Sequence, residues 1–212
     1  GSVFWRGGVV ALLRVDEDAP DLWSIEDDED SERVDELLED LVERDYVLKL
    51  PDSTFPGTHE YIFKHNKERV AIETRLNASL RRSLHRAAAD WMEHQQSVHS
   101  NEEYCAMLAR HREAAGDEYA AGLAYLRAAN LARSRYATTK ASEYYQHGLE
   151  FVGDRAVVWR IEALHNHGDV LQLNGRIEDA LFAFEEMLTL AYRLDLKAKG
   201  GAAHNRIGRL YR

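Results

Sequence analysis

The chain has 212 residues, of which 45% are hydrophobic and 30% charged, and its formal net charge is −10 at pH 7. This composition is typical of a folded globular domain rather than of a disordered chain. The net negative charge argues against bulk attraction to nucleic acid or anionic lipid. No apolar run approaches the roughly 20 residues of a membrane span. Cys105 is the only cysteine, so we expect no internal disulfide and a cytoplasmic location.

The first part of the chain combines helical and strand-like patterns. A short apolar segment at residues 3–13 precedes an acidic stretch, and apolar residues in 31–46 follow helical spacing, with Asp30 or Ser31 as N-cap. Two β-prone runs, 46–50 and 58–65, flank Pro-Asp and Pro-Gly turn signals and predict a β-hairpin. Short helix, helix and hairpin are the parts of a winged helix. We therefore expect a winged-helix-like module at residues 1–65.

The rest of the chain is predicted to be helical, because Ala, Leu, Arg and Glu are abundant and the whole sequence has only three prolines. Residues 66–98 are expected to form connecting helices, the second of them capped by Asn77. Further helices are predicted near 102–115, 117–134, 137–152, 155–174, 177–194 and 197–212. Gly116, Gly153 and Gly175 fall between them as stop signals. The predicted fold class is therefore mainly α.

A spaced pattern of small and aromatic residues recurs along residues 99–212. Gly168 is followed by Ala180 at +12 and Phe184 at +16, and Ala129 by Ala141 and Tyr145 at the same offsets. Gly208 repeats the position of Gly168 after 40 residues. Two antiparallel helices approach closely only where a side chain is small, and the large residue fills the adjoining gap. The pattern predicts tetratricopeptide-like helix pairs stacked as an α-solenoid, although the period of 39 to 40 exceeds the usual 34.

His165 and His167 lie in the most regular copy of this pattern, and a metal or catalytic role must be weighed against a packing role. Two residues apart on a helix, their side chains point about 200° apart and cannot chelate one ion. We therefore expect one packed ring and one ring on the open face. No Ser-His-Asp, Cys-His or phosphate-binding glycine motif accompanies them. We expect no enzyme activity, cofactor or metal in this segment.

The charge of the first module disfavours direct DNA reading. Residues 32–46, which would enter the major groove, contain seven acids and two bases, so their face repels the phosphate backbone. Basic residues follow instead at Lys64, Lys67, Arg69, Arg75, Arg81, Arg82 and Arg86. Two interpretations are open. Either these bases bind a phosphate group or a partner, or they neutralise the acidic loop and helix of the same molecule.

The segments FWRGGVVALL, EYIFKHNKERVAIETRL and RRSLHRAAADWMEH resemble the region that follows the nucleotide-binding core in bacterial STAND proteins, the signal-transduction ATPases with numerous domains. The resemblance extends over roughly residues 3–212. It implies a P-loop ATPase with ATP and Mg²⁺ in an upstream domain, and a kinase or cyclase effector elsewhere in the parent protein. It also implies that a histidine of the winged helix, His59 or His65, senses the nucleotide phosphates.

The expected function is that of a sensor and protein-interaction region. It would bind a protein or peptide along the inner face of the repeats and regulate the attached ATPase domain. The alternatives are a free-standing adaptor and a fragment of a transcription regulator whose DNA-binding domain lies elsewhere. We expect the last repeat to end after its first helix, which leaves an apolar helix face open to self-association. The expected partner-binding residues are Asn130, Arg133, His165, Asp169, Gln172, Asn205 and Arg209.

Overall fold

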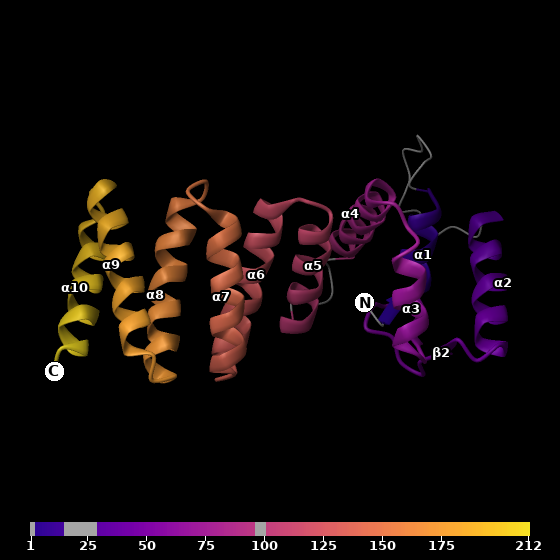
Figure 1. Cartoon of the computed structure of the whole chain (residues 1–212), viewed down its shortest axis with the longest axis horizontal. Helices are drawn as coiled ribbons and strands as arrows, with labels where there is room; N and C mark the ends of the chain where they lie inside the picture. Colours follow the sequence, from indigo (N-terminus) through magenta and orange to yellow (C-terminus); the bar gives the residue numbers. More distant parts are fainter. Residues whose placement is uncertain (1–2, 15–28, 96–100) are drawn as a thin grey trace. The chain divides into compact units, whose positions relative to one another are not determined.

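The computed structural model describes residues 3–14, 29–95 and 101–212 (Figure 1). The protein is mainly helical: helices make up 74% of it, and a small antiparallel sheet of three strands completes it. The chain divides into two compact units, residues 1–100 with 114–116 and residues 101–113 with 117–212. Within the described ranges, no helix is both long enough and apolar enough to cross a bilayer.

The first unit builds its sheet from strands that lie far apart in the sequence. Its elements are β1 (Val3–Trp5), α1 (Arg6–Leu13), α2 (Glu29–Glu43), β2 (Val47–Lys49), β3 (Glu60–Phe63), α3 (Asn66–Glu73) and α4 (Ala78–His94). The predicted hairpin is confirmed, since β2 pairs antiparallel with β3. The sequence did not predict β1, which pairs with the other edge of β3. Only three residues long and joined directly to α1, it has no alternation to reveal it.

Apolar side chains from the helices and the sheet meet in the core of this unit, around Val10, Val34, Leu38, Val47 and Tyr61. Helix α2 begins at Glu29. The predicted N-cap, Asp30 or Ser31, is therefore wrong, because both residues lie inside the helix, where Ser31 is buried. The prediction for Asn77 is confirmed, because its side chain accepts a hydrogen bond from the Leu80 amide at 2.8 Å.

The second unit consists of helices, and from α6 to α10 each of them packs against the next (Figure 1). They are α5 (Glu102–Ala114), α6 (Glu118–Ser134), α7 (Thr138–Val152), α8 (Val157–Leu173), α9 (Ile177–Arg193) and α10 (Lys197–Leu210). All six predicted helices are confirmed, with ends that differ by at most two residues. Gly116, Gly153 and Gly175 adopt positive φ after their helices, as stop signals do; Tyr136 and Asp195 take the same conformation without being glycine.

Close contacts between consecutive helices occur at the small residues of the pattern. Ala129, Ala141, Tyr145, Ala180 and Phe184 are all 0% exposed. A Cβ built on Gly168 would lie 2.5 Å from the Phe184 ring, so only glycine fits there. Gly208 was expected to pack in the same way, but the structure shows no such contact: apart from its own helix backbone, nothing described lies within 4 Å of a Cβ built there.

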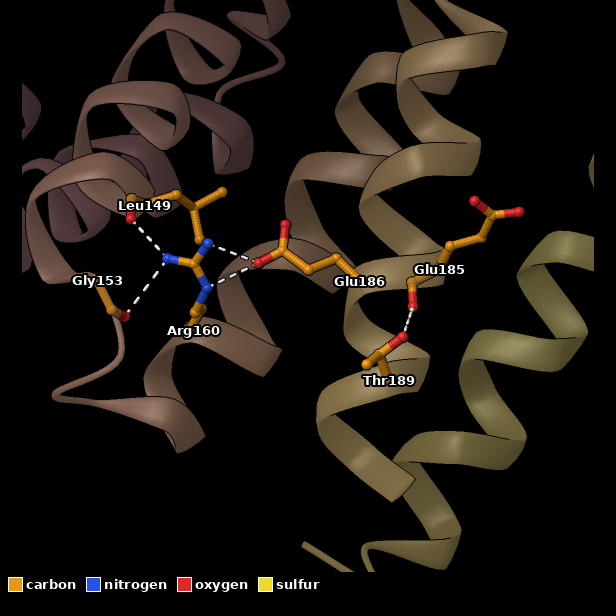
Figure 2. Close-up of polar contacts among 6 residues, drawn as sticks. All are labelled: Leu149, Gly153, Arg160, Glu185, Glu186 and Thr189. Atoms are coloured by element: carbon orange, nitrogen blue, oxygen red, sulfur yellow. Dashed lines mark hydrogen bonds and ion pairs between the residues drawn. The ribbon is translucent and has the colours of Figure 1, made fainter. Parts of the chain in front are cut away.

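Arg160 of α8 joins three helices of the second unit (Figure 2). Its Nε and Nη2 donate to Glu186 Oε1 on α9 at 2.8 and 2.6 Å, and its Nη1 donates to the Leu149 carbonyl at 2.8 Å at the end of α7. The guanidinium thus satisfies a terminal carbonyl of one helix while pairing with another helix.

We expect Arg160→Ala to lower the free energy of unfolding by about 2 kcal/mol, because it leaves the half-buried Glu186 carboxylate and the Leu149 carbonyl without this hydrogen-bond donor. Arg176→Ala is the matched control. The Arg176 side chain is 51% exposed, and its ion pair among the described residues is with Asp179 three residues away, so its loss should cost under about 0.5 kcal/mol. Urea unfolding followed by circular dichroism measures both. Equal costs for the two variants would contradict this role of Arg160.

Candidate partner-binding strip on α6, α8 and α10

Polar side chains connect alternate helices of the second unit. We call Asn130, His165, Asn166, Asp169 and Arg206 the polar strip; they lie on α6, α8 and α10. At the α8–α10 end of the strip, Arg206 Nη2 donates to Asp169 Oδ2 at 2.9 Å and approaches His165 Nε2 at 3.4 Å. His165 and Asp169 are one helical turn apart, 3.6 Å between Nε2 and Oδ2, so both reach the same guanidinium.

The charge at this end of the strip is incompletely compensated by hydrogen bonds. Burial lowers the pKa of His165 below its usual value, and nearby Arg206 adds to the effect while Asp169 opposes it. The ring is therefore mostly neutral at pH 7. Among the described residues, Asp169 Oδ1 is buried and has no hydrogen-bond partner. A buried carboxylate oxygen without a donor is costly. The Asp169 side chain as a whole is 24% exposed, so a bound group can still approach its ion pair with Arg206.

At the other end, the strip is tied to the helix core. Asn130 Oδ1 on α6 accepts two hydrogen bonds, from the Tyr145 hydroxyl at 2.5 Å and from Asn166 Nδ2 at 3.2 Å. Burial raises the pKa of Tyr145 to about 12, although the Arg133 guanidinium opposes the rise. Tyr145 therefore remains a hydrogen-bond donor at physiological pH, and it fixes the Asn130 amide toward α8.

His167 points away from the strip, toward α7. Its Nε2 lies 3.2 Å from Ser142 Oγ, and its ring packs against Tyr145 with centroids 5.6 Å apart. The prediction that the two histidines face different sides of the helix is thus confirmed. Within the described part of the chain, no group of three or more His, Cys, Asp or Glu side chains is arranged to hold a metal ion.

The structure places the seven predicted partner-binding residues in two groups. Asn130, His165 and Asp169 belong to the hydrogen-bonded strip, and Arg133 interacts with the Tyr145 hydroxyl. Gln172, Asn205 and Arg209 are exposed. On α10 it is Arg206, and not Asn205, that reaches α8. The two differ by one residue, a rotation of about 100° that the repeat pattern does not fix.

Sequence reasoning also missed Asn166. This residue lies between the two histidines that attracted attention and carries the link from α8 to α6. A usable signal for Arg206 was its place three residues before Arg209, which puts both on one helix face. Asn166 had no comparable signal, because amides occur on all faces of helices.

The chain was compared with known proteins. It matches no protein-family model. No curated protein matches it either.

His59 and His65, the two histidines that the resemblance implies as phosphate sensors, lie in different environments of the first unit. His59 lines a cavity of about 920 Å³ together with Arg6, Asp35, Lys49 and Tyr61. His65 is exposed at the start of α3 and makes no side-chain capping bond. His59 is therefore the better placed of the two to contact a bound molecule.

Proposed function

We propose that this chain is a non-enzymatic protein-interaction region that binds a protein or peptide along the polar strip. The single observation that carries the proposal is the Asp169–Arg206 ion pair across α8 and α10, whose side chains are 24% and 29% exposed and can therefore be reached by a bound group. Extended peptides present a backbone N–H at every second residue on each side, and such groups can bind to partly exposed polar side chains of this kind. The exposed Gln172 and Arg209 lie one turn further along the same faces of α8 and α10 and extend the surface.

The finer architecture is part of the same proposal. We infer that the second unit is a tetratricopeptide-like α-solenoid whose polar strip lies on its inner surface, and that the first unit is a winged-helix module. The helix pairs with close contacts at Gly168, Ala129 and Ala141 support the first inference. The antiparallel hairpin β2–β3 after α2 supports the second.

The strip is tested with an array of immobilised peptides of diverse sequence. We expect Arg209→Glu to weaken the binding of the peptides that wild-type protein retains by about tenfold, a usual loss for a charge reversal inside an interface. Arg193→Glu, also exposed but on α9, is the matched control and should leave binding unchanged. Equal binding by both variants, or no retained peptide, would count against the strip.

We further propose that the region belongs to a STAND-type signalling protein and regulates an attached ATPase in the cytoplasm. The proposal rests on the sequence resemblance, and no residue of this chain is assigned to ATP or Mg²⁺. Sequencing the parent gene upstream tests it: a P-loop followed by an acidic metal-binding strand is expected. If that domain is absent, a free-standing adaptor becomes the favoured alternative. The peptide array tests binding along the polar strip in either case.

A further inference from the structure

Helices α3 and α4 meet at a corner that buries no described side chain. Residues 67 and 69–82, which include most of α3, the turn and the first turns of α4, are exposed or half-buried throughout. Val70, Ile72 and Leu80 are 42%, 57% and 37% exposed. Helices of this length are marginal unless an apolar face is covered. We call this region, with Arg86 on the next turn of α4, the α3–α4 surface.

The α3–α4 surface is strongly basic, which bears on the two interpretations of the seven bases that the sequence left open. Lys64 pairs with Asp45, and Arg69 pairs with Glu73. The remaining five are exposed and form no ion pair with any residue that the structure describes: Lys67, Arg75, Arg81, Arg82 and Arg86. Within the described residues, neutralisation therefore accounts for two of the seven and leaves the other five without an ion pair. The acidic residues between 15 and 28, which could supply further counter-charge, lie outside the described residues.

The acidic counterpart lies on α2 of the same unit. Five exposed glutamates follow one another at spacings of three and four residues, which places them on one helix face: Glu29, Glu32, Glu36, Glu39 and Glu43. None of them forms an ion pair within the described ranges. Beside this glutamate stripe, Leu37 is 49% and Val42 is 37% exposed.

We propose that the α3–α4 surface docks on the glutamate stripe of a second copy of this chain. Each array repels itself when unpaired, and the two match in number of charges, in sign and in their apolar side chains. One contact of this kind relieves both arrays, whereas a separate partner for each would require two unrelated ligands. The same stripe repels nucleic acid and anionic membranes, so a second copy suits the pair of surfaces best.

Each copy carries both surfaces, so two copies can make the contact twice, related by a two-fold axis, or the contacts can continue into a larger ring. In either case the association is driven by charge. We therefore expect wild-type protein to self-associate at about 50 mM salt and to dissociate at about 500 mM, where screening is strong. Sedimentation velocity across a concentration series measures this.

Charge reversal provides the decisive test. Glu32→Lys, Glu36→Lys and Glu39→Lys together make both surfaces basic, and Arg75→Glu, Arg82→Glu and Arg86→Glu together make both acidic. Each triple variant alone is expected to be monomeric at low salt. An equal mixture of the two is expected to associate again, because every contact in the mixed pair joins opposite charges.

The control is Glu150→Lys, Glu178→Lys and Glu185→Lys, which changes the net charge as much as the first triple variant but at exposed positions of α7 and α9. It should associate like wild type, and circular dichroism should show all variants folded. A monomeric wild type at low salt, association by either test variant alone, or no recovery in the mixture would overturn the proposal. Because the polar strip is untouched, the peptide array remains a separate test.

Discussion

Gly168→Ala is expected to lower the free energy of unfolding by about 2 kcal/mol. A Cβ at this position would lie 2.5 Å from Phe184 Cε1 and 2.6 Å from Cζ, far inside van der Waals contact. The ring is 0% exposed and has no room to retreat. Overpacking of this kind costs about 1–3 kcal/mol, while the better helix propensity of alanine returns under about 1 kcal/mol.

Three further variants separate the clash from the effect of glycine itself: Gly208→Ala, Phe184→Leu and the double variant Gly168→Ala/Phe184→Leu. Gly208→Ala, on the open face of α10, should leave stability unchanged or raise it by up to about 1 kcal/mol. In a Phe184→Leu background the added methyl meets a smaller side chain, so Gly168→Ala should cost less than in wild type. Urea unfolding of wild type, Gly168→Ala, Phe184→Leu and the double variant measures the cycle, and Gly208→Ala is measured beside them. A Gly168→Ala chain as stable as wild type would refute the close approach of α8 and α9.

Acid should destabilise the protein in part through His167. Burial lowers the pKa of this imidazole from 6.5 to about 4, so the folded chain binds fewer protons than the unfolded chain between these pH values. Stability is therefore complete above pH 6.5 and falls as the pH drops toward 4. The full loss attributable to this residue is up to about 3 kcal/mol.

His167→Gln removes the titration and keeps a polar group near Ser142 Oγ, 3.2 Å from the imidazole in wild type. The variant should be less stable than wild type at pH 7.5 and should lose less stability between pH 6.5 and 4. His65→Gln, at an exposed position of the first unit, should show the wild-type pH profile. Urea midpoints at several pH values test this. Parallel profiles for wild type and His167→Gln would show that the histidine does not titrate in this window.

Much of the polar strip follows from helix periodicity, but its contacts do not. His165 and Asp169 were predicted to share a face because four residues make about one turn. Periodicity assigns a side chain to a face; it does not say which residue of the next helix will meet it. Arg206 instead of Asn205 reaches Asp169 because the rotation of α10 is set by the packing of Gly200 and Ala203, both buried.

The sequence by itself determined the helices of residues 101–212, the hairpin and the fully buried positions Ala129, Ala141, Ala180 and Phe184. These features depend on local spacing, turn residues and side-chain size. Strand β1 and the unpaired state of Asp169 Oδ1 were decided only by the tertiary structure. A three-residue strand exists because β3 offers a free edge, and an oxygen is left without a donor only once the helices around it are placed. Contacts between segments distant in sequence depend on packing in three dimensions, which no local pattern encodes.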